Sequence, residues 1–156
     1  MTVENAYRQA LGYLSKSPKT IHQMKEYLAD KGYSANIIEQ VIVQLSNFNY
    51  LDDRAFARQF IESRIRYKPK SVFALGFELR QKGIAPALAE ELLAAYKDED
   101  LALKAVETKK QAWNRLDESE CRKKMMNYLR YRGFDYSVCR TVWHIFQTKI
   151  QRNTPP

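Results

Sequence analysis

Hydrophobic and polar positions follow the same pattern three times along the chain. Each copy has a leucine, two or three polar or basic residues, a glycine and then a large apolar residue. The copies read "YLADKGY" at 27–33, "ELRQKGI" at 78–84 and "YLRYRGF" at 128–134. Their glycines, Gly32, Gly83 and Gly133, are 51 and 50 residues apart. A fixed period of this length predicts repeated structural units.

Apolar positions on both sides of each glycine match across the three repeats at helical spacing. Upstream of the glycine the matching pairs are Met24 and Leu28, Leu75 and Leu79, and Met125 and Leu129. Downstream the matching sets are Ile37, Val41, Ile42 and Leu45; Leu88, Leu92, Leu93 and Tyr96; and Val138, Val142, Trp143 and Phe146. Residues four apart stack on one helical face, so the pattern predicts a helix that ends at the glycine and another that follows it.

The sequence also predicts how the helix before each glycine ends and where it begins. Glycine readily takes the left-handed conformation that closes a helix, and the apolar residue after it folds back onto the last turn. The basic residue before it suits the negative end of the helix dipole. These basic residues are Lys31, Lys82 and Arg132. Pro18 and Pro69 are predicted to lie in the first turn, with Ser119 at the equivalent place in the third repeat.

A further helical pattern precedes this pair in each repeat. Its apolar stripes are Ala6, Ala10 and Leu14; Phe56, Ala57, Phe60, Ile61 and Ile65; and Ala105, Val106, Ala112 and Trp113. No segment alternates between apolar and polar residues as a strand would. The sequence therefore predicts an all-α protein with three tandem three-helix repeats, stacked into an elongated, curved body. The predicted bounds are 1–50, 51–97 and 98–150, followed by a disordered tail at 151–156.

Composition is typical of a folded protein. Of the 156 residues 45% are hydrophobic and 28% charged, which is too apolar for a disordered chain. No apolar run approaches the roughly 20 residues of a membrane helix, and the first residues do not resemble a signal peptide, so we expect a cytoplasmic protein with no membrane partner. Cys121 and Cys139 are too few and unpatterned for a disulfide framework or a zinc site, and are predicted to be buried core thiols.

The sequence lacks the usual motifs of catalysis and metal binding. It contains no Gly-rich phosphate loop, no paired-histidine motif and no Ser or Cys nucleophile with a plausible base. His22 and His144 lie in different repeats. Asp52 and Asp53 open a helix, where capping explains both acids. We therefore predict a binding protein that is not an enzyme, with no catalytic residue, no metal and no cofactor.

The net charge of +8 predicts an acidic partner, either a nucleic acid or an acidic protein surface. One candidate site is a basic turn with no acid between residues 63 and 77; it contains Arg64, Arg66, Lys68 and Lys70, with Tyr67 among them. The other is a basic helix with Arg122, Lys123, Lys124, Arg130 and Arg132, interleaved with Tyr128 and Tyr131. Basic and aromatic residues together fit phosphate contact and base stacking, and they fit an acidic protein groove equally well. The sequence leaves these two alternatives open.

Two segments resemble the RecX family, which regulates the RecA recombinase. They are "NYLDDRAFARQFIESRIRYKPKSVFALGFELRQKGI" at 49–84 and "MNYLRYRGFDYSVCRTVWHIF" at 126–146, and the similarity runs from about residue 6 to about residue 147. Two features depart from the family pattern. Asn49 stands where relatives commonly have glycine, and "RYKPKS" lacks the glycine that many relatives carry before the middle helix. Pro69 is expected to open that helix instead.

The resemblance implies a function that the residues alone do not reveal. RecX proteins bind RecA, are thought to lie in the groove of the RecA filament on DNA, and usually suppress its ATP hydrolysis, strand exchange and co-protease activity. A similar role here would make the protein an inhibitor of RecA in recombination, DNA repair and the SOS response. The family offers no catalytic residue to carry over, and direct DNA contact and oligomeric state stay open, with a monomer as the expectation. The alternative is a helical nucleic-acid-binding module that acts independently of RecA.

Overall fold

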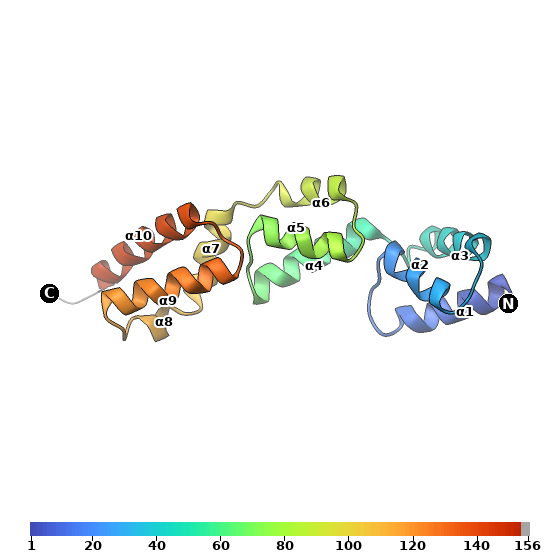
Figure 1. Ribbon diagram of the computed structural model, residues 1–156, viewed down its shortest axis with the longest axis horizontal. Coiled ribbons are helices and arrows are strands. Elements are labelled where there is room, and N and C mark those ends of the chain that lie inside the picture. The colour runs from blue at the N-terminus through green and yellow to red at the C-terminus, as the bar shows by residue number, and fades with distance from the viewer. Residues whose placement is uncertain (154–156) are drawn as a thin grey trace. The chain divides into compact units, whose positions relative to one another are not determined.

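A computed structural model describes the backbone of residues 1–153 and the side chains of residues 1–148 (Figure 1). Within these residues it contains ten helices and no strand. They are α1 (Val3–Leu14), α2 (Ile21–Asp30), α3 (Ala35–Asn47), α4 (Asp53–Tyr67), α5 (Val72–Gln81), α6 (Pro86–Leu93), α7 (Asp98–Glu107), α8 (Lys110–Trp113), α9 (Glu118–Tyr131) and α10 (Tyr136–Asn153). The predicted all-α fold is confirmed. A disordered tail was predicted at 151–156. Residues 154–156 of that range lie outside the described residues.

The first repeat consists of α1, α2 and α3, which pack against one another. Its core is formed by buried apolar residues from all three helices and the segments between them: Ala6, Ala10, Met24, Leu28, Tyr33, Ile38, Val41, Ile42, Leu45 and Leu51. Beside this core the rings of Tyr13 and Tyr27 stack at 4.0 Å between centroids. Three short helices thus enclose an apolar centre, as the periodic pattern predicts.

The third repeat differs from the prediction in its first helix, which is divided into α7 and the one-turn helix α8. Trp113 at the end of α8 is buried and meets Tyr128 and Phe146 edge to face, with ring centroids 5.3 and 6.2 Å apart. Ala112, which was predicted to be in the apolar stripe, is exposed; it lies in α8, after the turn at residues 108–109 that separates α8 from α7. Helices α7, α9 and α10 pack against one another.

The helix ends at the three glycines follow the predicted geometry. Gly32, Gly83 and Gly133 have φ of 90°, 86° and 92°, in the left-handed region. The residue after each glycine donates its N–H to the carbonyl of the repeated leucine, at 3.2, 3.0 and 3.1 Å. This bond closes the helix, and the apolar side chains after the glycines, Tyr33, Ile84 and Phe134, are buried. Asn49 also has a positive φ, 61°, in the left-handed region that asparagine enters more readily than most residues.

The first residues of α2 and α5 differ from the prediction that a proline lies in the first turn of each helix. Pro18 and Pro69 precede α2 and α5 and are not in their first turns. Thr20 and Ser71 begin these helices instead, because their hydroxyl oxygens accept the N–H groups of Gln23 and Ala74 at 3.1 and 3.0 Å. In the third repeat Asp117 caps α9, and Ser119 lies in the first turn of that helix, as predicted. The predicted cap at Asp52 is confirmed, since its carboxylate accepts the N–H of Ala55 at 3.1 Å.

The described chain forms two compact units, each of which is considered by itself. Unit 1 contains residues 1–60 and 78–92, and unit 2 contains residues 61–77 and the described residues from 93 onward. The division passes through α4 and α5, so each unit combines an outer repeat with part of the middle one. Each unit therefore contains one junction between consecutive repeats.

In unit 1 the start of α2 is bonded to the middle repeat. The Thr20 hydroxyl, which is fully buried, donates to the Lys82 carbonyl at 2.6 Å. The N–H of Ile21 donates to the Asp53 carboxylate at 2.9 Å. Gly83 lies so close that a Cβ there would be 2.1 Å from the Cβ of His22. The glycine therefore ends a helix and also makes room for the start of another.

The same arrangement recurs in unit 2. The N–H of Ser71 donates to the Arg132 carbonyl at 3.1 Å, and the N–H of Val72 donates to the Asp98 carboxylate at 2.8 Å. A Cβ at Gly133 would be 2.6 Å from the Ser71 hydroxyl oxygen. Helix-starting N–H groups that need an acceptor thus find one in the next repeat.

Candidate partner-binding surface

The basic turn joins the end of α4 to the start of α5 and lies in unit 2. Arg66 and Lys68 are exposed, whereas Arg64 and Lys70 are half-buried. Arg64 and Lys70 each have an interaction partner within the protein, although no acid lies near them in the sequence. Arg66 and Lys68 are the two cations of the turn that are most accessible to a binding partner.

The turn is attached to the end of α9, which brings the two predicted clusters together. The Arg132 guanidinium donates to the Pro69 carbonyl at 3.2 Å and lies 4.3 Å from the Tyr128 ring centroid. Its own carbonyl accepts the N–H of Ser71. Arg132 was predicted to bind a partner, but its half-buried side chain already holds the basic turn in place.

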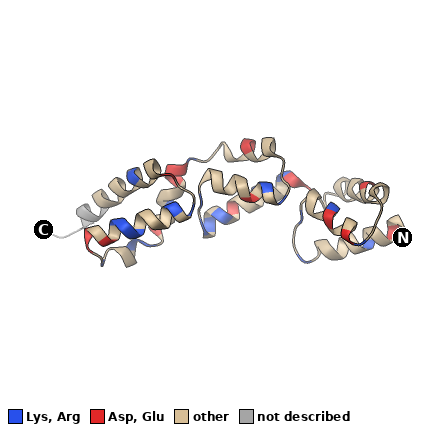
Figure 2. Cartoon of the chain, in the orientation of Figure 1, with Lys and Arg blue, Asp and Glu red and all other residues tan. Residues whose placement is uncertain are grey.

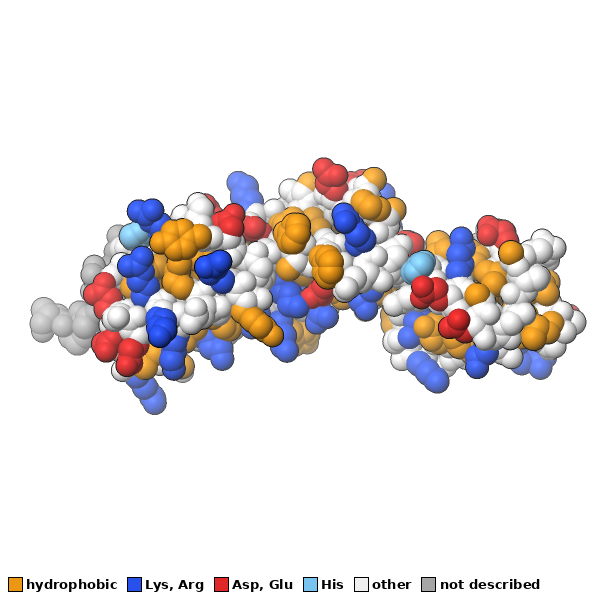
Figure 3. Space-filling model, viewed as in Figure 1, with side chains coloured by type: hydrophobic (Ala, Val, Ile, Leu, Met, Phe, Trp, Pro, Cys, Tyr) orange, Lys and Arg blue, Asp and Glu red, His pale blue; other side chains and the backbone are white. Residues whose placement is uncertain are grey.

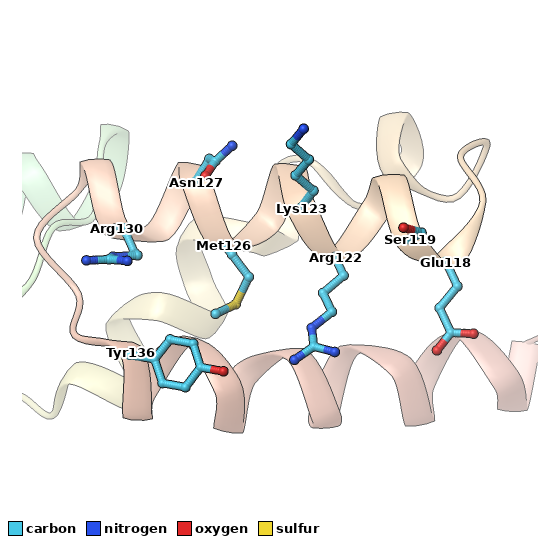
Figure 4. Close-up of a pocket in the computed structure, with 8 residues that line it drawn as sticks. All are labelled: Glu118, Ser119, Arg122, Lys123, Met126, Asn127, Arg130 and Tyr136. Carbon is cyan, nitrogen blue, oxygen red and sulfur yellow. The ribbon is translucent and has the colours of Figure 1, made fainter.

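The remaining basic residues of α9 are exposed and lie on different sides of the helix. Figure 2 shows Lys and Arg along α9, and in Figure 4 the Lys123 side chain points away from α10, whereas Arg122 extends toward α10. Lys124 is exposed, as are Arg122, Lys123 and Arg130. Within the described residues none of these four forms an ion pair with an acidic side chain. Their charge is therefore available at the surface.

A groove runs between α9 and the start of α10, with a volume of about 610 Å³. Arg122, Met126 and Arg130 follow one another at intervals of four residues along its α9 side, and Tyr136 borders it from α10 (Figure 4). Glu118 lines one end, where its carboxylate accepts a hydrogen bond from the Gln147 amide. The groove thus combines three cations, Arg122, Lys123 and Arg130, with apolar and aromatic surface.

Exposed aromatic rings lie in the same unit and were only partly predicted. Tyr67 and Tyr131, at 73% and 94% exposed, were named with the basic clusters. Phe73 and Phe77, at 81% and 54% exposed, were not anticipated. Their exposure could have been predicted from the sequence. Each lies two residues from the buried Leu75 and therefore on a different face of α5 from the core residues. Figure 3 shows hydrophobic side chains at the surface among the Lys and Arg side chains of the molecule.

The side chains that could bind a metal do not cluster among the described residues. No group of three or more His, Cys, Asp or Glu side chains suited to a metal ion occurs among the described residues. Cys121 and Cys139 are buried free thiols, as predicted. Burial raises the pKa of both, and at Cys139 the Asp135 carboxylate raises it further. A raised pKa keeps a thiol protonated and a poor nucleophile.

The two histidines belong to different units. His22 forms an i,i+4 pair with Glu26, at 3.0 Å between the ring nitrogen and the carboxylate, and its side chain is half exposed. His144 is exposed on α10. No helix in the described part of the chain has the length and apolar character needed to span a bilayer.

Comparison with known proteins gives a consistent match along the chain. Family models described as the first, second and third three-helix domains of RecX match residues 6–45, 52–93 and 97–143. Regulatory protein RecX of Prosthecochloris aestuarii is 38% identical over 135 residues, which are 86% of this chain and 89% of that protein. Regulatory protein RecX of Chlorobium limicola is 36% identical over 140 residues, covering 89% and 88%.

Solved structures match the fold at lower sequence identity. The crystal structure of RecX from Lactobacillus salivarius matches with a TM-score of 0.78 at 20% identity, over 94% of this chain and 97% of that one. A second crystal structure of a regulatory protein RecX matches with a TM-score of 0.70 at 23% identity, over 90% and 70%. These likenesses support the tandem three-helix architecture.

Proposed function

The chain belongs to the RecX family, and from this premise we propose that it is a non-enzymatic regulator of the RecA recombinase. It binds RecA in the groove of the filament on DNA and inhibits ATP hydrolysis, strand exchange and co-protease activity. Its place of action is the cytoplasm, where RecA and DNA meet. The observation that carries the proposal is the family match, which extends through all three tandem domains.

The contact residues that we propose are the exposed cations of unit 2. Arg66 and Lys68 in the turn and Arg122, Lys123, Lys124 and Arg130 on α9 are exposed, and exposed aromatic rings accompany them. Arg and Tyr commonly anchor protein interfaces, while Lys on the rim speeds association with an acidic partner. Arg132 supports the basic turn through its hydrogen bond to the Pro69 carbonyl.

Inhibition requires that the protein bind one state of RecA more tightly than another. ATP turnover takes RecA through different conformations, and a bound protein slows this cycle only through differential affinity for them. A protein that contacts neighbouring RecA subunits can supply this difference, because its contacts depend on the spacing between those subunits.

The test is the DNA-dependent ATPase activity of RecA from the same organism. Purified protein added below the molar amount of RecA should lower the rate. Loss of inhibition after Arg66→Glu and Lys68→Glu, with inhibition retained after Arg115→Glu, would place the contact on the basic turn. An unchanged ATPase rate over a wide range of protein-to-RecA ratios would refute the regulatory proposal.

A nucleic-acid-binding role independent of RecA is the second candidate. It is favoured by Tyr131, which is 94% exposed beside Arg130, since aromatic rings next to cations can stack on bases. This role requires tight DNA binding by the protein alone, with an affinity that falls steeply as salt rises. Weak, salt-independent retention of DNA would exclude it.

A further inference from the structure

We propose that the groove between α9 and α10 binds an extended acidic peptide segment with the pattern acid, any residue, apolar, any residue, acid. The proposal concerns Arg122, Met126, Arg130 and Tyr136, all within unit 2. It rests on the proposed function in one respect, since the acidic peptide segment would belong to the protein that this chain regulates. Binding of the peptide itself can be measured without RecA.

The spacing of the groove residues selects an extended peptide. Arg122, Met126 and Arg130 are four residues apart on one helix, which places them at intervals of about 6 Å along its axis. Alternate residues of an extended chain point to one side at intervals of about 6.6 Å. An acid, an apolar residue and a second acid in alternate positions therefore lie opposite Arg122, Met126 and Arg130 in turn.

The chemistry of the groove matches each position of that pattern. An arginine guanidinium can bind a carboxylate through two parallel hydrogen bonds, and no acid among the described residues pairs with Arg122 or Arg130. Met126 is half-buried and presents a flexible apolar side chain, which adapts to different apolar partners. Tyr136 is 53% exposed at the opposite wall and offers a ring for the same apolar residue.

A peptide fits the groove better than a nucleic acid does. Glu118 lines the end of the groove next to Arg122, and its carboxylate would repel a phosphate backbone that continued in that direction. The Gln147 amide already satisfies one oxygen of that carboxylate. A short peptide that ends or turns polar beyond the acid opposite Arg122 brings no further negative charge toward Glu118.

The experiment measures binding of fluorescent peptides to the full chain by polarisation. The first peptide has Glu, Ser, Leu, Ser, Glu at its centre, and the second has the same residues with the two glutamates adjacent. The first peptide should bind more tightly than the second. Arg122→Glu with Arg130→Glu should weaken its binding by about tenfold or more, because two ion pairs are replaced by repulsion.

Two further variants keep the proposal falsifiable. Arg122→Gln with Arg130→Gln removes the attraction without adding repulsion and should weaken binding less than the charge reversal. Arg115→Glu changes an exposed arginine outside the groove and should leave binding unchanged. Circular dichroism and melting should be the same for all variants, since each changed side chain is exposed.

Three results would overturn the proposal. The first is equal affinity for the two peptides, and the second is binding that the double charge reversal does not weaken. The third is a single-stranded oligonucleotide that displaces the peptide and binds more tightly in a manner that depends on Arg122 and Arg130. A peptide that binds as expected while RecA activity is unaffected would retain the groove assignment and refute the proposed function.

Discussion

Replacing Gly83 with alanine should destabilise the protein more than the same replacement at Gly32. Both glycines have a left-handed backbone, with φ of 86° and 90°, so each alanine incurs a conformational cost of about 1–2 kcal/mol. Their surroundings differ. An added Cβ at Gly83 would be 2.1 Å from the Cβ and 2.4 Å from the Cγ of His22, whereas at Gly32 the nearest atom is the flexible end of Met1 at 3.3 Å.

The steric clash at Gly83 adds a second cost. Forcing extra atoms into a packed contact typically costs about 1–3 kcal/mol, so the expected loss is about 2–5 kcal/mol at Gly83 and about 1–2 kcal/mol at Gly32. Shortening the neighbouring side chain in a His22→Ala background should not relieve the clash, because the closest atom of His22 is the Cβ that alanine retains. The clash is therefore a property of how closely the two backbones approach.

Urea and thermal unfolding followed by far-ultraviolet circular dichroism measure these losses. Each kcal/mol should lower the melting temperature by about 2–4 °C in a chain of this size. Gly12→Ala is the matched control, since Gly12 lies within α1 with nothing within 4 Å, and alanine there should stabilise by about 0.5–1 kcal/mol. Equal losses at Gly83 and Gly32 would refute a close contact between the repeats at Gly83.

Three further predictions concern other sites. Arg66→Glu with Lys68→Glu should weaken inhibition of the RecA ATPase and leave the melting temperature nearly unchanged, because both side chains are exposed. Asp53→Ala should lower the free energy of unfolding by about 1–3 kcal/mol, since the N–H of Ile21 loses its acceptor, while Asp53→Asn should retain most of the stability. The thiol of Cys139 should resist a thiol reagent at neutral pH until the protein unfolds, because its raised pKa and burial leave little accessible thiolate.

Each of these predictions has a contradicting outcome. Retained inhibition after the double charge reversal would remove the basic turn from the contact surface. Equal losses in the free energy of unfolding for Asp53→Ala and Asp53→Asn would show that the hydrogen bond from the Ile21 N–H to the side chain at position 53 does not stabilise the protein. Rapid labelling of Cys139 in the folded protein would show that α10 opens readily.

The repeating part of the fold could be predicted because it depends on local periodicity. Met24, Leu75 and Met125 are fully buried, as their matched spacing predicts. Positions 37, 88 and 138 were also predicted to face the core but are only half-buried; their neighbours Ile38, Ala89 and Cys139 are buried instead. Spacing specifies the helix face to within about one position, and the neighbouring helices determine which residue is innermost.

Features that depend on contacts between distant residues could not be predicted in this way. Thr20 and Ser71 were missed as helix starts because the nearby prolines gave a stronger local signal. Arg132 was assigned to a partner because nothing in the sequence reveals its hydrogen bond to Pro69, 63 residues away. The exposure of Phe73 likewise depends on what the tertiary structure leaves uncovered. The candidate surface could be located from charge, but the roles of its individual residues could not.

The junctions between repeats determine which hydrogen bonds can form while the protein is still being synthesised. The Thr20 hydroxyl finds its acceptor 62 residues later along the chain, at Lys82. While the chain emerges from the ribosome, the apolar residues of the first repeat can pack together. The hydrogen bonds at the start of α2 form only after the middle repeat has been synthesised. The same delay applies to Ser71, which waits for Arg132. Synthesis from the N-terminus should therefore leave the first and second repeats incompletely bonded at one end until the repeat that follows each has been translated.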